Sequence, residues 1–401
     1  MDRRSFLHGT AALAGYSALG LTGCTKKPVT AAMPGAPSLP LYDAVGPITP
    51  IRADVDRIFR ITVCLRPFRA AGPRLDVEKV GDKTFVHNYG HGGSGWSLSW
   101  GSADVVVRKA LAAADGRKEV AIIGCGALGL TAAITAQRAG LKVTIYAKER
   151  PPYVRSSRAT GSWTPDSRIA LTSAASTNFA AEWESMARTS FSMYQSFLGM
   201  PGAPVEWTDR YALNDEEHGQ RGGETQLHDF AHYYDRIADL TPRQQLLPTG
   251  THPFPTKYVY RTSSLTFNVA DYSRQLMNDF FIAGGTIETR EFHSPQEMAS
   301  LPQPVIINCP GYGARQLWSD ESIVPVRGQI AWLIPQEGVH YGLYYKGVNV
   351  LARRDGIVVQ TGRSEEEGWN DANEQPDRAA AVAGVEVLQE LYSRMQAMKR
   401  S

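Results

Sequence analysis

The sequence predicts an α/β protein with a Rossmann-like parallel sheet. The main observation is the order strand, glycine-rich turn, helix and strand between Glu119 and Tyr146, which is typical of dinucleotide-binding units. The second observation is size and composition, because 401 residues, 43% hydrophobic and 20% charged, are enough to bury a large core. We therefore expect a globular body made of one large or two interleaved domains.

Charge and cysteine content argue against two other classes of protein. The 42 basic and 40 acidic residues leave a net charge of +2, and no basic block could neutralise a row of phosphates, so nucleic acid is not an expected partner. The four cysteines have neither metal-ligand spacing nor the density of a disulfide scaffold. They are Cys24, Cys64, Cys125 and Cys309. We expect no structural disulfide and no metal site.

The first 24 residues are typical of an export signal. Arg3 and Arg4 precede a weakly apolar stretch that is shorter than the about 20 residues of a bilayer span. The paired arginines resemble a twin-arginine signal, and Leu21–Cys24 resembles a bacterial lipobox, whose cysteine is lipidated. We expect export by the twin-arginine route to the periplasm or cell envelope, with membrane contact only through a lipid anchor at Cys24. An ordinary secretory signal is the alternative.

Residues 25–50 form a proline-rich linker. Six prolines favour an extended, semi-rigid spacer over a packed element. They are Pro28, Pro34, Pro37, Pro40, Pro47 and Pro50.

The glycine-rich turn lies in the context that dinucleotide binding requires. A short apolar strand at Glu119–Ile123 precedes the turn, an alanine-rich helix at Leu130–Ala139 follows it, and Leu141–Tyr146 forms the next strand. The turn itself is Gly124, Cys125, Gly126, Ala127, Leu128 and Gly129. A glycine turn in an ordinary α/β unit is the alternative.

Each glycine of this turn has a separate task. Gly124 permits the tight turn, Gly126 lets the backbone approach a pyrophosphate, and Gly129 lets the helix pack closely on the strand. The helix N-terminus offers free amides and a positive dipole end to the anion. Glu149, 20 residues after Gly129, is placed to hold a ribose.

A second glycine-rich segment, VHNYGHGGSGWSLSWGSA from Val86 to Ala103, precedes this turn. Its glycines supply free amides and unusual backbone angles, which suit a loop along a flat ring system with negative charge. The segment resembles the C-terminal signature of the D-amino-acid oxidase family, and ten positions match. They are His87, Asn88, Tyr89, Gly90, His91, Gly92, Gly93, Gly95, Gly101 and Ala103. The resemblance implies FAD as the cofactor, and we expect a helix at Asp104–Ala114 to follow.

Other segments extend the resemblance. Arg66 lies in CLRPFRAAGPRL, which resembles the family's Arg-Pro-x-Arg segment. The stretch Tyr146–Asp166 resembles the family's flavin-contacting loop, although Lys148 occupies the acidic ribose position and Glu149 follows one residue late. The matching residues of that loop are Ser156, Gly161, Trp163 and Pro165.

The order of these segments differs from the family order. In the family the dinucleotide turn opens the chain and the arginine segment and glycine signature close it, whereas here the last two come first and a helix at Asp377–Met398 comes last. The chain therefore resembles a circular permutant. Its old ends would be joined across Ala114–Lys118, five residues that span about 17 Å when extended, and its new ends would open before a strand at Asp56–Val63. Fusion of two copies followed by trimming leaves the same order.

The resemblance implies two interleaved domains. The first is a glutathione-reductase-type FAD-binding domain with a Rossmann-like parallel sheet, expected at residues 56–172 and 255–322. The second is an antiparallel-sheet substrate domain, expected at residues 173–254 and 323–400. In the permuted order, Val305–Gly311 resembles the end of the first domain and Val326–Ile330 resembles the entry to the second.

The implied activity is oxidation of the Cα–N bond of an amino acid, of D configuration, by hydride transfer to flavin, with hydrogen peroxide formed when oxygen is the acceptor. By resemblance, Arg66 clamps the substrate carboxylate, the Gly93 carbonyl accepts an amine hydrogen and Tyr345 lies over the substrate. The implied FAD-binding residues are Gly92, Gly93, Gly95, Trp96, Ser97, Gly124, Gly126, Ala127, Leu128, Gly129, Glu149, Ser156 and Gly161.

Substrate and electron acceptor stay open at this stage. Asn349 replaces the family's second tyrosine, for which Tyr341 or Tyr344 are alternatives, and Arg363 favours an acidic substrate unless it is merely a solvated arginine. The alternatives to an oxidase are a membrane-tethered flavin dehydrogenase that passes electrons to a quinone or carrier protein, a non-catalytic FAD and amino-acid binder, and a nicotinamide-dependent enzyme. No residue pattern indicates the oligomeric state.

Overall fold

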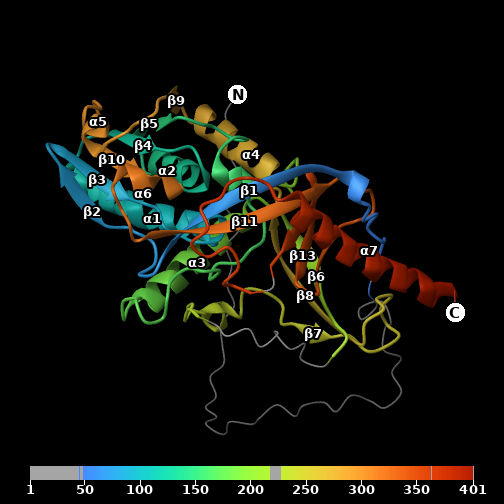
Figure 1. The fold of residues 1–401 in the computed structure, drawn as a ribbon. Helices are drawn as coiled ribbons and strands as arrows, with labels where there is room; N and C mark the ends of the chain where they lie inside the picture. Colours follow the sequence, from blue (N-terminus) through green and yellow to red (C-terminus); the bar gives the residue numbers. More distant parts are fainter. Residues whose placement is uncertain (1–44, 46–47, 217–226, 363, 401) are drawn as a thin grey trace, which may run out of the picture. The chain divides into compact units, whose positions relative to one another are not determined.

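The computed structural model describes residues 45, 48–216, 227–362 and 364–400, which belong to one compact unit starting at Val45 (Figure 1). The predicted export signal with Arg3, Arg4 and Cys24, most of the predicted linker, and Arg363 lie outside the described residues. Within the described part of the chain, no helix is long and apolar enough to cross a membrane.

The first sheet is the predicted Rossmann-like sheet. Its six strands run in the order β2-β3-β10-β4-β5-β9, and all neighbours are parallel except β2 and β3. The strands are β2 (Val77–Val80), β3 (Lys83–His87), β4 (Glu119–Ile123), β5 (Lys142–Ala147), β9 (Thr286–Thr289) and β10 (Val305–Asn308). β4 has the predicted bounds and lies inside the sheet, because its apolar residues need cover on both faces.

Helices cover both faces of this sheet (Figure 1). One face packs against three helices, α1 (Gly95–Ala114), α2 (Ala127–Arg138) and α4 (Val269–Ile282). The other face packs against two short helices, α5 (Pro295–Ala299) and α6 (Ala314–Leu317). Side chains alternate along β4 accordingly, with Val120 and Ile122 in the first cluster and Ala121 and Ile123 in the second.

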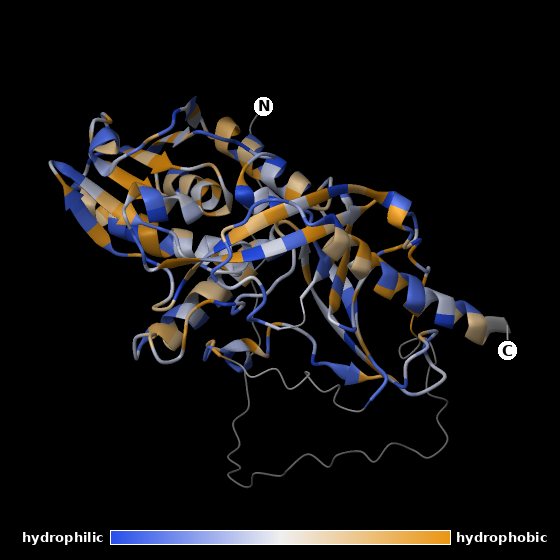
Figure 2. Ribbon diagram, viewed as in Figure 1, coloured by the Kyte–Doolittle hydropathy of each residue, from blue (hydrophilic) through white to orange (hydrophobic). Residues whose placement is uncertain are grey.

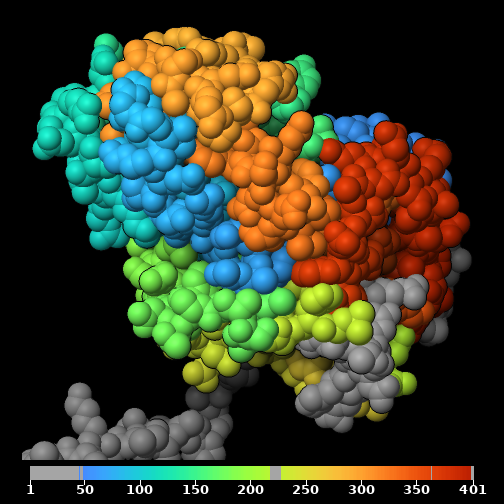
Figure 3. Space-filling view, turned by 60° about the vertical axis from the view of Figure 1, so that its left-hand side comes forward, coloured from blue at the N-terminus to red at the C-terminus, as the bar shows by residue number. Residues whose placement is uncertain are grey.

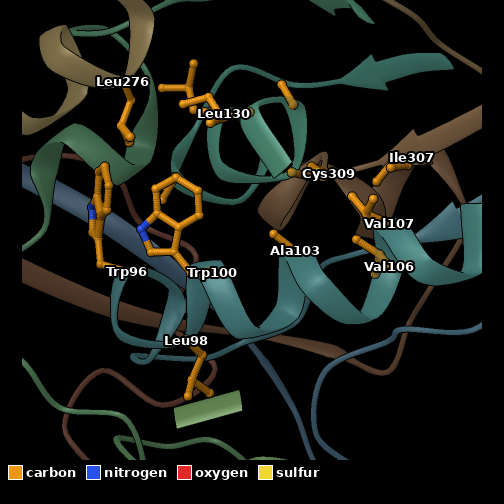
Figure 4. Packing of buried hydrophobic residues seen from close by; sticks show 14 of the residues in the cluster. Trp96, Leu98, Trp100, Ala103, Val106, Val107, Leu130, Leu276, Ile307 and Cys309 are labelled. Atoms are coloured by element: carbon orange, nitrogen blue, oxygen red, sulfur yellow. The ribbon is translucent and has the colours of Figure 1, made fainter. Parts of the chain in front are cut away.

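The largest hydrophobic cluster joins α1 to the sheet and to α2. In Figure 4, Val106 and Val107 of α1 lie near Ile307, while Trp100 lies near Leu130 of α2. Figure 2 shows the same pattern for the whole unit, because apolar residues concentrate on the strands and the inner helix faces. A further helix, α3 (Phe179–Gln195), contacts α1.

The second sheet has eight strands in the order β1-β11-β14-β13-β12-β6-β8-β7. It is antiparallel except between β12 and β6, which agrees with the antiparallel sheet predicted for the substrate domain. The strands are β1 (Ile58–Arg69), β6 (Val205–Asn214), β7 (Gln245–Leu246), β8 (Tyr258–Phe267), β11 (Ile323–Leu333), β12 (Tyr341–Tyr345), β13 (Val348–Arg353) and β14 (Gly356–Thr361). The last helix, α7 (Arg378–Arg400), covers one face.

The predicted domain boundaries were wrong at two strands. β1 lies in the range 56–172 and β8 lies in the range 255–322, both assigned to the FAD-binding domain, yet both pair within the second sheet. The reason is that β1 is longer than the predicted strand at Asp56–Val63 and pairs with β11 along most of its length. The second sheet therefore draws strands from early, middle and late parts of the chain.

The early segment of the chain lies among later segments. β1 pairs with β11, and β3 pairs with β10, so the blue residues of Figure 3 border orange residues near position 310. The connection between α1 and β4 is short, and residues 115–118 are exposed. At the other end, Ile51 and Ala53 join the hydrophobic cluster that contains Leu388, Tyr392 and Met395 of α7. This geometry is compatible with the permuted order.

A chain opened at residue 118 tests whether the order of the segments matters for folding. The variant would start at Lys118, join Met398 to Asp56 through a short flexible linker and end at Ala114. Because the core contacts are unchanged, it should unfold cooperatively, with an unfolding midpoint close to that of the natural order, as measured by circular dichroism.

A control chain opened inside β4, between Ala121 and Ile122, should not unfold cooperatively, because it cuts a central strand. Equal behaviour of the two variants would contradict this account of the fold.

Candidate functional site

A cavity of about 650 Å³ lies where the two sheets meet the glycine-rich segments. Its size is in the usual range for a ligand pocket. The dinucleotide turn, the glycine signature, the loop 154–168 and the loop after β10 line it, together with residues of β1, β11, β13 and β14. Segments that are far apart in the sequence thus form one site.

Two glycines of the dinucleotide turn have the structural roles that the sequence predicts. Gly124 has φ of +98°, and a Cβ on Gly129 would lie only 2.0 Å from the Gly124 carbonyl oxygen, so both glycines serve the tight approach of helix to strand. Gly126, Ala127 and Leu128 line the cavity. The N-cap residue of α2 is a glycine and has no side chain that could cap the helix, so this end of the helix, whose residues line the cavity, presents a positive dipole and backbone amides.

The far end of the cavity beyond this turn contains the predicted ribose residue. Glu149 lines the cavity, as does Lys148, whose ammonium group lies 3.2 Å from an oxygen of Glu291. Ser156 also lines the cavity, and its hydroxyl accepts a hydrogen bond of 3.1 Å from the backbone amide of Ala127. The cavity lining therefore includes charged groups, and the hydroxyl of Ser156 lies at the helix end.

The glycine signature reaches the same cavity. Gly92, Gly93 and Gly95 line it, and so does Trp96, whose indole donates a hydrogen bond to the Ser156 carbonyl oxygen at 2.8 Å. Helix α1 starts inside the signature at Gly95 rather than at Asp104, so its first turn contributes to the site.

Two predicted FAD-binding residues do not line the cavity. Ser97 is buried behind it, where its hydroxyl accepts a hydrogen bond from the backbone amide of Thr164. Gly129 is fully engaged in packing against Gly124. Gly161, by contrast, lines the cavity as predicted, with φ of +89°.

Arg66, the predicted carboxylate-binding residue, lies on β1 and lines the cavity. Its side chain lies over Gly328, where an added Cβ would come within 2.4 Å of the guanidinium, and it donates a hydrogen bond of 3.2 Å to the Arg327 carbonyl oxygen. Burial lowers the pKa of Arg66. A charged guanidinium that lines the cavity suits recognition of a carboxylate.

The predicted position of Tyr345 over the substrate was wrong. Tyr345 points toward α7, where its hydroxyl contacts Glu390 and Arg394, and it does not line the cavity. Side chains alternate along a strand, so a register shift of one residue moves a side chain to the opposite face. Asn349, which pairs with Tyr344 in the sheet, lines the cavity instead.

Three more residues of the second sheet bear on the site. Two tyrosines were considered as replacements for the missing tyrosine, and one cavity residue was not predicted. Tyr341 is buried on the α7 side, bonded to Tyr392, and so cannot replace the missing tyrosine. Tyr344 is 38% exposed and does not line the cavity. Gln360 lines the cavity and was not predicted, although its strand position opposite Asn349 would have indicated it once the register was known.

Arginines of the loop 154–168 were also missed. Arg155, Arg158 and Arg168 line the cavity together with Arg66. A guanidinium nitrogen of Arg155 lies 2.5 Å from one carboxylate oxygen of Glu374, and a guanidinium nitrogen of Arg158 lies 3.6 Å from the other. Their presence in a segment rich in arginine was the available signal, but the sequence does not show which side chains turn inward.

The histidines of the signature are not cationic groups. His91 lines the cavity, and burial lowers its pKa to about 3, so its ring is neutral near pH 7. One ring nitrogen lies 2.6 Å from the hydroxyl of Ser102. His87 is fully buried beside Glu78 and Asn308. Cys64, Cys125 and Cys309 are unpaired thiols.

The chain is similar to several known proteins over much of its length. The model of the DAO family of FAD-dependent oxidoreductases matches residues 119–399, which begin at β4. A D-amino-acid oxidase of Rubrobacter xylanophilus is 28% identical over 270 residues, which cover 65% of this chain and 73% of the relative. A D-amino-acid oxidase of Streptomyces coelicolor is 26% identical over 276 residues, which cover 66% and 75%. Glycine oxidase of Geobacillus kaustophilus has a TM-score of 0.49 at 14% identity, covering 69% and 77%.

Substitution of Gly129 tests the packing that shapes the cavity. Gly129→Ala places a methyl group against the Gly124 carbonyl oxygen, so overpacking should lower the free energy of unfolding by about 3 kcal/mol in urea titrations. Gly95→Ala is the matched control, because the space around Gly95 is open and alanine favours a helix. An equal effect of both substitutions would show that the close approach does not limit stability.

Proposed function

This chain belongs to the DAO family of FAD-dependent oxidoreductases, and we propose that it oxidises the Cα–N bond of an amino acid, with a preference for the D configuration. The observation that carries the proposal is that Arg66, the glycine signature and the dinucleotide turn line a single cavity. A guanidinium that would bind the substrate carboxylate therefore lies in the same cavity as the residues that would hold the cofactor.

The residues of the cavity fit FAD. The N-terminus of α2 suits the pyrophosphate, Gly126 leaves room for it beside Ser156, and Glu149 suits the ribose. Gly92 and Gly93, which carry no side chain, suit the flavin ring. Bound FAD supplies a two-electron oxidant for the substrate.

The chain's own residues bind and orient the substrate. Arg66 holds the carboxylate, and the Gly93 carbonyl oxygen accepts a hydrogen bond from the amine, so the Cα–H bond faces the cofactor. The amino acid loses a hydride from Cα and a proton from nitrogen, and water hydrolyses the resulting imino acid to a keto acid and ammonia. With oxygen as acceptor, the two electrons leave as hydrogen peroxide.

Anaerobic reduction tests the proposed activity. Amino acids of both configurations are added to the FAD-bound protein without oxygen, and a D-amino acid should bleach the visible flavin absorbance. Admission of oxygen should restore the absorbance and form one equivalent of peroxide. A bound flavin that no amino acid reduces would contradict the proposal. Reduction without peroxide would indicate a quinone or carrier protein as acceptor.

The permuted order is part of the same proposal. The family match begins at Glu119, whereas Arg66 and the glycine signature precede it and still line the cavity. Circular permutation explains both facts, because it moves the segments along the chain without moving them in space.

Substitution of Arg66 tests its role. Arg66→Leu and Arg66→Lys should leave FAD bound but weaken substrate binding by about 3 kcal/mol, roughly a hundredfold, because the fork that pairs with the carboxylate is lost. Arg69→Lys, on the same strand and close to Asp320, is the control and should bind substrate normally. Unchanged apparent affinity of both Arg66 variants for every substrate would exclude this assignment.

Export is a separate part of the proposal and rests on the first 24 residues alone. The paired arginines support twin-arginine export to the periplasm or cell envelope, and Cys24 supports a lipid anchor. Replacement of Arg3 and Arg4 by lysine should hold the protein in the cytoplasm, as cell fractionation would show. Cys24→Ser should release an active protein from membranes. Delivery of the double-lysine variant to the envelope would refute the twin-arginine route.

A further inference from the structure

We propose that Arg168 is a second substrate-binding arginine, which selects amino acids whose side chain carries an acidic group. The proposal rests on the amino-acid oxidation proposed above and names the class of substrate. Arg168 and Arg66 come from opposite sides of the dinucleotide turn in the sequence, yet both line the same cavity.

The backbone of Arg168 is fixed beside the glycine signature. Its φ is +50°, a left-handed conformation that is uncommon for residues other than glycine and is often retained at functional sites. Its carbonyl oxygen lies so close to Gly92 that a Cβ there would come within 1.8 Å. The amide of Gly93 donates a hydrogen bond of 2.9 Å to the carbonyl oxygen of Ser167. Arg168 therefore lies at the end of the cavity that Gly92, Gly93 and Arg66 define.

The side chain of Arg168 is held by neutral acceptors. Its Nε donates a hydrogen bond of 2.7 Å to the Glu365 carbonyl oxygen, and Nη2 donates one of 3.2 Å to the Ser364 carbonyl oxygen. Neither bond uses Nη1. Two carbonyl oxygens orient the guanidinium without neutralising it, which leaves its positive charge for a ligand.

Two positive charges thus share the cavity. Burial and the nearby charge of Arg66 lower the pKa of Arg168, which is about 10. The carboxylates of Glu365, Glu366 and Glu367 act in the opposite direction, but Glu365 pairs with His232 and Glu366 pairs with His228. A substrate with one carboxylate would satisfy one guanidinium, whereas a dicarboxylic amino acid would satisfy both.

Amide side chains of the second sheet also line the cavity. Asn349 and Gln360 are opposite one another on neighbouring strands, and both line it. The amide oxygen of Gln360 accepts a hydrogen bond of 2.6 Å from the hydroxyl of Thr160, which leaves its NH₂ group as the donor. Such a donor suits a carboxylate oxygen.

The test compares acidic amino acids with their amides in the FAD-bound protein. The substrates are D-aspartate against D-asparagine and D-glutamate against D-glutamine, and the readout is the ratio of kcat/KM values. The natural protein should prefer the acids. Arg168→Gln should lower the acid-to-amide ratio at least about tenfold, mainly through KM, because it removes a charge that only the acids use. Arg168→Lys keeps the charge and should retain part of the preference.

Arg188→Gln is the control, since Arg188 is an arginine of α3 that pairs with Glu184 and Asp239 away from the cavity. It should leave the ratio unchanged. Thermal unfolding and FAD content should show that all variants fold. Loss of activity toward acids and amides to the same extent in Arg168→Gln, or no preference in the natural protein, would overturn the proposal.

A binding experiment separates this proposal from the proposed activity. Succinate and succinamate differ only in that one acid group of succinate is an amide in succinamate, and their affinities for the FAD-bound protein are measured by calorimetry without turnover. Succinate should bind more tightly, and Arg168→Gln should remove most of the difference. If no amino acid is oxidised but this difference is found, the site assignment of Arg168 stands and the activity fails. Equal binding of the two ligands would refute the site itself.

Discussion

The site depends on one close backbone contact, between the glycine signature and the loop 154–168. Gly92 and Gly93 pack so tightly on Ser167 and Arg168 that a Cβ at Gly92 would lie 1.8 Å from a carbonyl oxygen. The contact joins the start of α1 to the loop that follows the dinucleotide unit. Because side chains are excluded there, the backbone alone forms that wall of the cavity, and Arg168 is brought beside Arg66. The same close contact fixes the geometry on which binding and orientation depend.

The charge of the cavity is the second constraint. Five arginines line it. Two of them, Arg155 and Arg158, pair with Glu374, whereas Glu365 and Glu366 pair with histidines, so positive charge remains in the cavity and suits anions. The N-terminus of α2 adds a positive dipole. An anionic dinucleotide and an anionic substrate would therefore stabilise the folded state as well as occupy the site, because ligands that bind only the native state raise its stability.

Local sequence patterns predicted the dinucleotide unit well but not the long-range pairing. β4 has the predicted bounds because a short apolar run, a glycine turn and an alanine-rich helix are all local signals. Tyr345 was placed on the wrong face because strand register depends on partners elsewhere in the chain, and one residue of shift reverses every side chain. β1 was assigned to the wrong sheet for a related reason, since its partner β11 is more than 250 residues away in the sequence. Arg168 was missed because its direction is set by tertiary contacts.

The most direct test of the account is a crystal structure of the protein with FAD bound. The account predicts the pyrophosphate at the N-terminus of α2 and the flavin ring against Gly92 and Gly93, on the side of the cavity that contains Arg66. It therefore predicts one cofactor in contact with segments from both sides of the proposed permutation point. A flavin ring more than about 7 Å from Gly93, roughly two residue lengths, would contradict the central claim.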